Sequence, residues 1–349
     1  MKTIHEIIFA NSQNMENIED NSIILVVTSN PYPIIEIWDT LFSQQNSVID
    51  QALNNNNGSL AFELMHKELD EVWNEVYRVL GDGGIACINV RDATRKIGVD
   101  FQLYSNHSRI LKHCIEIGFQ TLPGILWRKP TNAPNKFMGS GMLPPGAYVT
   151  LEHEHILILR KRGKREFKTE EEKKIRRESA FFWEERNVWF SDIWDIGGIS
   201  QSLKTEDTRS RSAAYPFELA YRLVNMFSVK KDTILDPFLG TGTTTLAAMS
   251  AGRNSIGYEI NSNFKKIIYS RVEDIVSFSN KRIEDRLKNH MEFVQNRMKD
   301  GKDFKYKNIH YNFPVVTKQE IELYFNKLLK INKIDSNLFE ITHGSSIKS

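Results

Sequence analysis

The sequence predicts an α/β fold in which a largely parallel sheet carries helices on both faces. Strand-like runs alternate with segments whose apolar residues recur at helical spacing, in residues 1–159 and again in residues 212–275. Residues 22–28 form a nearly continuous run of β-branched and apolar residues, which is typical of a strand buried on both faces of a parallel sheet. A glycine-containing turn also joins a strand at residues 233–235 to a helix at residues 243–250.

The first half of the chain holds most of these elements. We expect strands at residues 4–10, 22–28, 84–90, 119–127 and 155–159, a helical turn or two at residues 13–18, and helices at residues 60–80 and 107–117. In the longest helix, apolar residues such as Phe62, Met65 and Leu69 share one face, and Gly81 supplies the stop. The polar stretches at residues 43–59 and 131–146 are expected to be long loops.

Residues 160–211 interrupt this alternation. They are dense in Lys, Arg and Glu and then carry an aromatic cluster, so we interpret them as an inserted subdomain. The α/β pattern resumes with helices at residues 215–227 and 243–250 and from residue 264, and with strands at residues 233–235 and 255–258. Residues 276–349 contain Lys-rich helical segments that have no strand partner, and we expect a helical C-terminal extension.

Composition excludes several classes of protein. The chain has 349 residues, and no apolar run approaches the roughly 20 residues that cross a bilayer, so no membrane partner is expected. Its two cysteines, Cys87 and Cys114, provide neither a disulfide framework nor a metal cluster and fit a cytoplasmic location. The formal charge of +2 neither supports nor excludes a nucleic-acid partner.

The most informative motif is the turn at residues 236–244, with the sequence Asp-Pro-Phe-Leu-Gly-Thr-Gly-Thr-Thr. A strand, a glycine turn and a helix start present backbone amides to a ligand, because glycine permits positive φ and close approach. Thr245 stands where the dinucleotide fingerprint has its third glycine, and no Gly-Lys-Ser/Thr follows. Glu259, which ends the next strand 23 positions after Asp236, is suited to accept hydrogen bonds from ribose hydroxyls.

This turn resembles the S-adenosylmethionine motif Asp-Pro-Phe-x-Gly-x-Gly-Thr-Thr of amino-group DNA methyltransferases and matches it at every fixed position. The chain is similar to the permuted beta class of that family, in which the catalytic motif precedes the cofactor motif. The resemblance implies a circularly permuted, Rossmann-like methyltransferase fold and S-adenosyl-L-methionine as the cofactor. The residues it assigns to the cofactor are Asp236, Pro237, Phe238, Gly240, Gly242, Thr243, Thr244, Glu259, Asn11, Pro216, Phe217 and Glu218.

Four of these residues come from two further segments, one at the N-terminus and one before the glycine turn. Permutation requires the N-terminus to supply the strand beside that of Glu259, and residues 4–10 fit, with Asn11 in the loop that would reach the cofactor adenine. Pro216 suits a first helical turn, and the resemblance places Phe217 and Glu218 beside the methionine part.

The family also expects a tetrapeptide of the form Asp/Asn/Ser-Pro-Pro-Tyr/Phe after a buried strand, and Ser29, Asn30, Pro31 and Tyr32 follow residues 22–28. An exocyclic amine must be polarised by acceptors before it attacks a methyl group, and Ser29 Oγ and the Asn30 carbonyl would supply them. Tyr32 would stack on a base rotated out of the duplex. Asn30 departs from the usual proline and loses its fixed φ.

The resemblance also implies which nucleobase is methylated, which residues contact DNA and which partners the protein has. Serine at position 29 favours N4 of cytosine, with N6 of adenine as the alternative. Residues 160–211 occupy the place of the target-recognition region, and their basic run would contact phosphates through Arg160, Lys161, Arg162, Lys164, Arg165 and Lys168. The resemblance implies double-stranded DNA, a homodimer and a cognate restriction endonuclease as partners. No metal site is expected at His153 and His155.

Two alternative functions remain open. One is a DNA-binding protein with a degenerate tetrapeptide that does not turn over, and the other is an RNA methyltransferase.

Overall fold

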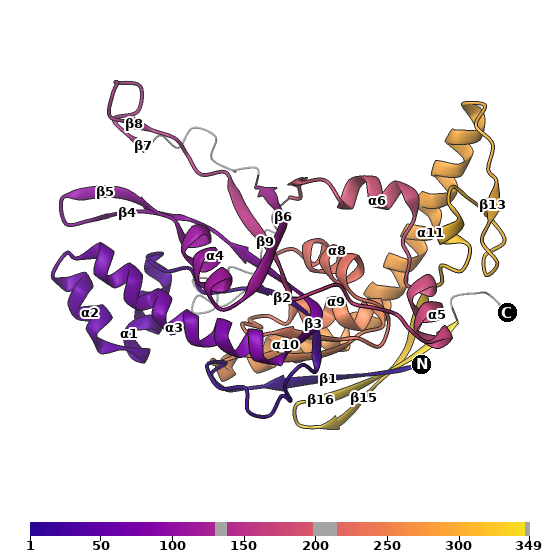
Figure 1. Ribbon diagram of the computed structural model, residues 1–349, viewed down its shortest axis with the longest axis horizontal. Helices are drawn as coiled ribbons and strands as arrows, with labels where there is room; N and C mark the ends of the chain where they lie inside the picture. The colour runs from indigo at the N-terminus through magenta and orange to yellow at the C-terminus, as the bar shows by residue number, and fades with distance from the viewer. Residues whose placement is uncertain (130–137, 198–214, 346–349) are drawn as a thin grey trace.

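Ten strands form the central sheet in the computed structural model, which describes residues 1–129, 138–197 and 215–345 (Figure 1). The strand order across the sheet is β10, β6, β9, β3, β2, β11, β12, β1, β16 and β15. In chain order, these strands are β1 (Lys2–Ile8), β2 (Ile23–Ser29), β3 (Leu80–Val90), β6 (Phe119–Arg128), β9 (His153–Lys161), β10 (Ile193–Asp195), β11 (Thr233–Asp236), β12 (Asn254–Tyr258), β15 (Asn326–Asp335) and β16 (Leu338–Ser345).

The central strands β3, β2, β11, β12 and β1 run parallel to one another. β9 lies antiparallel between β3 and β6, and β16 lies antiparallel beside β1. The chain passes from β2 to β3 on one side and from β11 to β12 on the other, so its connections diverge between β2 and β11. Open parallel sheets bind ligands at such a divergence, outside the carboxyl ends of the strands. The predicted fold class is confirmed.

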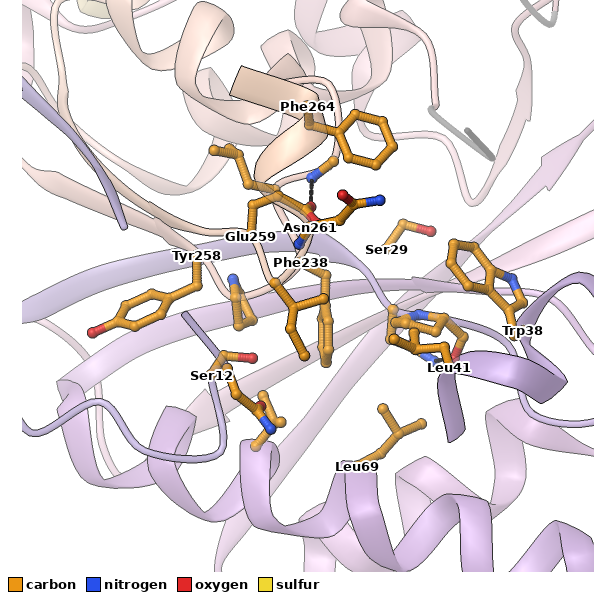
Figure 2. A pocket seen from close by; sticks show the side chains of 18 of the residues that line it. Ser12, Ser29, Trp38, Leu41, Leu69, Phe238, Tyr258, Glu259, Asn261 and Phe264 are labelled. Atoms are coloured by element: carbon orange, nitrogen blue, oxygen red, sulfur yellow. Dashed lines mark hydrogen bonds between the residues drawn. The ribbon is translucent and has the colours of Figure 1, made fainter. Parts of the chain in front are cut away.

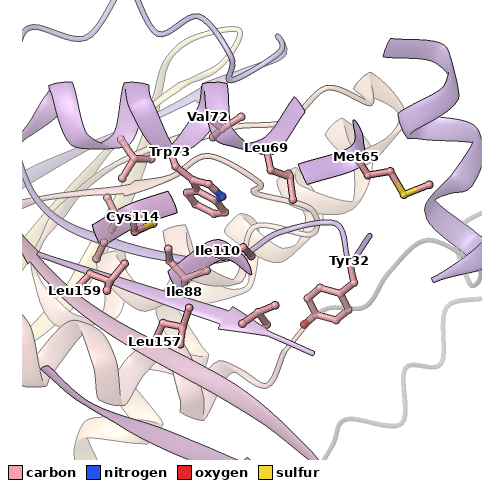
Figure 3. Close-up of a cluster of buried hydrophobic side chains, with 14 of the residues drawn as sticks. Tyr32, Met65, Leu69, Val72, Trp73, Ile88, Ile110, Cys114, Leu157 and Leu159 are labelled. Carbon is pink, nitrogen blue, oxygen red and sulfur yellow. The ribbon is translucent and has the colours of Figure 1, made fainter. Parts of the chain in front are cut away.

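Helices cover both faces of this sheet. α3 (Gly58–Val79) and α4 (Asn106–Glu116) pack on one face, and α8 (Phe217–Phe227) and α9 (Thr243–Ala251) pack on the other. α3 forms where the apolar spacing predicts it, and the Asn57 side chain caps it by accepting from Leu60 N at 3.1 Å. Its buried face presents Met65, Leu69 and Trp73 to the sheet (Figure 3).

The N-terminal strand has the position that a permuted chain requires. β1 pairs in parallel with β12, and Glu259 N donates to Ile8 O at 2.9 Å where the two strands end. α10 (Lys265–Glu273) and α11 (Ile275–Lys299) follow β12, and a cluster containing Ile7, Leu246 and Ile268 joins α9 and α10 to β1. The beginning and the middle of the chain therefore complete one half of the sheet together.

The expected loop at residues 43–59 is wrong over most of its length. The end of α1 (Asp39–Gln45), which follows the 3-10 helix η1 (Glu36–Trp38), then α2 (Ser47–Asn54) and the start of α3 occupy this region. Asn46 caps α2 by accepting from Val48 N at 3.1 Å, and Ile49 and Ala52 are buried at helical spacing. Short polar helices of this kind depend on tertiary packing, which their own sequence does not reveal.

The expected helical C-terminal extension is also wrong beyond α11. After β13 (Tyr306–Lys307), β14 (Pro314–Val315) and the 3-10 helix η3 (Lys318–Glu320), the chain forms the hairpin β15 and β16, which adds to β1. β15 is an edge strand that buries Leu328 and leaves half of its ten residues exposed, so its apolar residues do not alternate as in a half-buried strand. Its hairpin partner β16 pairs in turn with β1 at the other end of the chain, and local spacing does not reveal that contact.

The described part of residues 160–211 contributes to cores formed with other segments. It contains α5 (Glu170–Glu178), α6 (Trp183–Trp189) and β10, and β10 pairs in parallel with β6. Phe182 packs with Ile283 of α11 and with Phe313, so this region and the C-terminal region share a core. Residues 198–211 lie outside the described residues.

Two hairpins complete the architecture. β4 (Ala93–Ile97) and β5 (Asp100–Tyr104) follow β3 (Figure 1). β7 (Met138–Gly139), inside the expected loop at residues 131–146, pairs with β8 (Ala147–Tyr148), just after it, and both precede β9. Residues 131–137 lie outside the described residues. In the parts of the chain that the structure describes, no helix is long and apolar enough to span a membrane.

Candidate active site

A cavity of about 430 Å³ lies at the divergence between β2 and β11 (Figure 2). Its walls come from the loop after β1, the turn after β2, the glycine turn after β11 and the loop after β12. Because these strands are parallel, their carboxyl ends bring the four segments to one edge of the sheet, here called the catalytic edge. α1 and α3 close the cavity from the other side, with Leu41 and Leu69 pointing into it.

The glycine turn has the backbone conformation that its sequence demands. Gly240 and Gly242 have φ values of 53° and 82°, and Gly242 is the N-cap of α9. A Cβ added to Gly242 would lie 3.2 Å from Ile268 Cγ2, whereas one added to Gly240 would meet nothing closer than 4.0 Å. The lack of a side chain at Gly242 therefore allows close packing against Ile268, and the lack of one at Gly240 keeps the cavity wall open for a ligand.

Glu259 places a carboxylate in the cavity wall. Its Oε2 accepts from Gly240 N and its Oε1 accepts from Asn261 N, both at 2.8 Å (Figure 2). Burial raises the pKa of this carboxyl to about 7, and the nearby charge of Asp236 adds to the increase. Each oxygen keeps a lone pair for a further donor, so the group is suited to bind two hydroxyls.

Asp236 has a different role from the predicted one. Its side chain is buried and accepts from Thr28 Oγ1 and Thr244 Oγ1, each at 2.6 Å, and from Phe238 N at 3.1 Å. It does not line the cavity. Burial raises its pKa to about 6. Asp236 and Thr244 thus join β2, β11 and α9 and hold the glycine turn in place.

The structure divides the predicted cofactor residues into two groups. Those that line the cavity are Asn11, Pro237, Phe238, Gly240, Thr243 and Glu259. Those that stand behind its wall or away from it are Asp236, Gly242, Thr244, Pro216, Phe217 and Glu218. The second group includes every predicted residue of α8.

The expectation for the start of α8 is therefore wrong in this structure. Phe217 packs edge-on against Phe278 of α11 with ring centroids 4.7 Å apart. Glu218 pairs with Arg222 at 2.7 Å and with Arg282 of α11. Both side chains are used to attach α8 to α11, and among the described residues next to the start of α8 it is Tyr215 that reaches the cavity.

Sequence reasoning missed the opposite wall. Trp38, Leu41 and Phe42 line the cavity from η1 and α1, and Leu69 lines it from α3. The spacing of Trp38, Leu41 and Phe42 is helical and is the one available signal, but the polar stretch that follows concealed it. Ser12 joins them from the loop after β1 (Figure 2).

The turn after β2 brings Ser29, Asn30 and Pro31 to the same cavity. Asn30 Nδ2 donates to Pro31 O at 2.6 Å, so a hydrogen bond closes the turn where the resembling family has the rigid ring of proline. Further along the turn, Ile34 has a φ of 68°, which is strained for a β-branched residue. Asn106 of α4 supports the turn by donating to Pro33 O at 3.1 Å.

Tyr32 does not have the exposed face that stacking on a base requires. Its side chain is 4% exposed, and its ring lies at the edge of the cluster under α3 (Figure 3). Its hydroxyl lies 2.8 Å from Ser29 Oγ and donates to Glu154 Oε2 at 3.0 Å. The prediction of a free aromatic face is therefore wrong for this arrangement, because the hydroxyl finds buried acceptors.

A group of potential metal ligands lies beside this turn. Ligand atoms of Asp92, His107 and His155 all lie within 4.8 Å of one another. Asp92 Oδ1 accepts from His107 N at 3.0 Å and so caps α4, and the rings of His107 and His155 stack with centroids 3.8 Å apart. Asp92 and His107 therefore serve the start of α4, and His155, which lies on β9, packs against His107.

Comparisons with known proteins give the family. The family model for N6/N4 methyltransferases, described as DNA methylase, matches residues 23–270. The chain is 56% identical to the type II methyltransferase M.MthZI of Methanothermobacter thermautotrophicus, over 97% of this chain and 95% of that protein. It is 50% identical to M.MjaI of Methanocaldococcus jannaschii, over 77% of this chain and 91% of that protein. The chain belongs to this family.

Solved structures agree with the assignment. TTHA0409 of Thermus thermophilus, in complex with S-adenosyl-L-methionine, matches with a TM-score of 0.59 and 31% identity over 78% of this chain and 95% of that one. The cytosine-N4-specific PvuII DNA methyltransferase shares the fold, with a TM-score of 0.55 and 16% identity over 80% of this chain and 92% of that one.

The chain is thus a DNA methyltransferase of the N4/N6 amino class, and its cofactor is S-adenosylmethionine, as the glycine turn predicts. The cavity fits that molecule. Glu259 can accept from ribose hydroxyls, Gly240 permits close approach of the ligand, and Phe238 and Leu69 supply apolar surface.

The predicted DNA-binding run of the methyltransferase lies at the other edge of the sheet. β9 begins at the catalytic edge and ends at Lys161, beside the start of β3. Lys161 is 4% exposed, and its Nζ donates to Tyr77 O and Leu80 O at 2.6 and 2.7 Å. Arg162 pairs with Asp82 and Arg165 with Asp232.

Lys161 is thus a structural residue, and the prediction that it contacts phosphate is wrong. Of the other members of the run, Arg160 donates to Gln120 Oε1, and Lys164 and Lys168 are exposed. Arg160 and Lys161 end β9 and the other members follow it, so the run lies away from the cavity, because antiparallel β9 carries the chain across the sheet.

Proposed function

We propose that this chain transfers a methyl group from S-adenosylmethionine to N4 of cytosine in duplex DNA. The observation that carries the proposal is that Ser29 and Asn30 line the same cavity as Gly240 and Glu259. An amine held at the first pair and a methyl donor held at the second would meet within one cavity. Serine at position 29 favours cytosine, because serine accompanies mostly N4-cytosine methylation in the family whose motif it matches.

The chemical task of the protein is to make a poor nucleophile reactive. The lone pair of an exocyclic amine is delocalised into the base, and acceptors on its hydrogens favour the tetrahedral geometry that frees it. Ser29 Oγ and the Asn30 carbonyl would accept these two hydrogens and hold the nitrogen in line. When bound, S-adenosylmethionine supplies an electrophilic methyl group on a sulfonium.

A covalent enzyme intermediate has no part in this scheme. Cys87 and Cys114 are buried, and burial raises the pKa of both thiols well above the ordinary value. Neither residue lines the cavity.

We propose that DNA lies along the catalytic edge and that the target base is rotated out of the duplex into the cavity. The two hairpins on this side support the proposal, because Phe101 of β5 and Tyr148 of β8 stack with centroids 4.8 Å apart and leave apolar surface exposed. Lys96 and Arg128 are exposed on the same side of the sheet and suit phosphate contacts.

The biological setting that we propose is restriction and modification, with a cognate endonuclease acting on the same site. The names of the relatives M.MthZI and M.MjaI, both type II methyltransferases, support it. Homodimerisation stays a prediction.

The test is methylation of unmodified DNA followed by mass spectrometry of the nucleosides. We expect N4-methylcytosine from the wild-type protein and none from Ser29→Ala. N6-methyladenine without N4-methylcytosine would refute the base assignment. No transfer by a wild-type protein that binds the cofactor would favour a non-catalytic DNA-binding protein, and preferential methylation of structured RNA over duplex DNA would favour an RNA enzyme.

A further inference from the structure

A chain of hydrogen bonds connects the catalytic turn to a buried carboxylate on β9. Ser29 Oγ lies 2.8 Å from the Tyr32 hydroxyl, which donates to Glu154 Oε2 at 3.0 Å. Glu154 lies at the catalytic end of β9, and its side chain is 2% exposed. The predicted acceptor for the target amine is therefore linked to a carboxylate that solvent hardly reaches.

Two further residues hold Glu154 in place. Lys129 Nζ pairs with Glu154 Oε1, and Asn89 Nδ2 donates to Oε2 at 2.6 Å. Lys129 itself lies 4.3 Å from the centroid of the Trp127 ring at the end of β6. A buried carboxylate is tolerated when an opposite charge and hydrogen bonds compensate for its lost hydration. Glu154 has both, from two neighbouring strands.

The direction of the bonds follows from the number of protons. A tyrosine hydroxyl carries one proton, and an ionised carboxylate can only accept, so Tyr32 donates to Glu154. Ser29 then donates its own proton to Tyr32 Oη. Asn89 Nδ2 lies 3.3 Å from Ser29 Oγ and 3.0 Å from Tyr32 Oη, so at least one lone pair of Ser29 stays for an outside donor. Burial, with a contribution from the charge of Glu154, raises the pKa of Tyr32 well above its ordinary value, so the phenol keeps its proton.

We propose that this series of hydrogen bonds, from Ser29 through Tyr32 to Glu154, makes Ser29 an obligatory acceptor for the target amine and takes up the proton that the amine loses. The inference rests on the proposed function and adds Glu154 as a positioning residue that acts through Tyr32. A serine hydroxyl is otherwise free to turn its proton toward the amine lone pair and so oppose the reaction. The chain excludes that orientation.

The protons and electrons of the step balance. As the amine nitrogen bonds to the methyl carbon, the carbon–sulfur bond breaks and its electron pair stays on sulfur. The amine proton moves to Ser29 Oγ, the Ser29 proton to Tyr32 Oη and the Tyr32 proton to Glu154. The methylated base leaves uncharged, and Glu154 returns its proton through Tyr32 and Ser29 to water that enters the cavity before the next turnover.

The test compares Tyr32→Phe, Glu154→Gln and the double variant in single-turnover methyl transfer to DNA. Tyr32→Phe removes the link without removing the ring. Glu154→Gln presents an amide donor that reverses the direction of the bonds. We expect each variant to slow transfer by about 10- to 100-fold, a range typical of a lost acid–base or electrostatic contribution. The double variant should be no slower than the slower single one, because one chain is broken in every case.

Binding measurements separate this role from a structural one. The dissociation constants for S-adenosylmethionine and for DNA should stay within about threefold of wild type in both single variants, so that the loss appears in the rate. Glu152→Gln is the matched control, because Glu152 is an exposed carboxylate two positions away on the same segment, and it should leave the rate unchanged.

Three results would decide against the proposal. Transfer by Tyr32→Phe within about twofold of wild type would refute the link, and multiplicative losses in the double variant would refute a shared chain. A loss confined to binding would assign Glu154 to folding of the site. Absence of transfer by the wild-type protein would instead refute the proposed function. If Glu154→Gln does not fold, the transfer rate of Tyr32→Phe still decides. A rate like that of the wild type refutes the proposal, and a slower rate supports it.

Discussion

Affinity for S-adenosylmethionine should fall as the pH is lowered through neutrality, and Glu259 is the reason. Burial raises the pKa of Glu259 to about 7 in the protein without ligand. Ribose hydroxyls donate to the ionised carboxylate and cannot donate in the same way to a carboxylic acid, so binding selects the ionised form. At acid pH, binding must therefore first remove a proton from this group.

The size of the effect follows from the fraction that is ionised. With a pKa of about 7, roughly one group in eleven is ionised at about pH 6 and roughly ten in eleven at about pH 8. The dissociation constant should therefore be about tenfold larger at the lower pH, equivalent to about 1.4 kcal/mol. In the protein without ligand, the raised pKa of Glu259 stabilises the folded state at low pH. This contribution to the free energy of unfolding is lost as the pH rises through about 7.

The assay is equilibrium binding of labelled S-adenosylmethionine from about pH 6 to about pH 8, in the wild type and in Glu259→Gln. The variant cannot ionise and should bind weakly, with no slope. Glu68→Gln, which alters another carboxylate of the cavity wall, should keep the wild-type slope. A wild-type affinity that changes less than about twofold would refute the argument. A slope that persists in Glu259→Gln would assign the titration to another group.

Three further predictions concern stability and DNA binding. Lys161→Met should lower the free energy of unfolding by about 2–4 kcal/mol in chemical denaturation, because it removes a donor from buried Leu80 O and from the partly buried Tyr77 O and Arg78 O, whereas Lys164→Met should change neither stability nor DNA affinity. Glu185→Ala should lower the free energy of unfolding by about 3–5 kcal/mol, measured in the same way, because it leaves buried Arg286, whose Nε donates to Glu185 at 2.6 Å, without its carboxylate partner. A loss smaller than about 1 kcal/mol would show that water reaches the site. Lys96→Met should weaken DNA binding several-fold and reduce its salt dependence by about one phosphate contact in a titration, and an unchanged salt slope would remove the β4–β5 hairpin from the interface.

Local chemistry explains which parts of the site were predictable. The glycine turn needs positive φ at Gly240 and Gly242, and that need is visible in the residues themselves. Likewise, a buried strand that ends in Ser29 and a second that ends near Glu259 must meet at one edge of a parallel sheet. Both ends of the cavity were therefore predicted, although the wall formed by Trp38 and Leu41 was not.

The errors share a physical cause. The basic run around Lys161 predicts a contact with DNA, yet antiparallel β9 carries that run to the far edge of the sheet. The resemblance places Phe217 and Glu218 at the cofactor, yet both side chains contact α11 instead. In each case, the residue type is compatible with both roles, and a partner far along the chain selects one of them.

By itself, the sequence determined the α/β class, the order of the catalytic and cofactor halves, and the family, because these depend on periodicity and on residues whose backbone needs are specific. Tertiary structure alone decided that the C-terminal hairpin extends the sheet and that Glu154 stands behind Ser29 and Tyr32. Glu154 follows Tyr32 by 122 positions. Only the packing of β9 against β3 brings this carboxylate to the catalytic turn, and no local pattern records that contact.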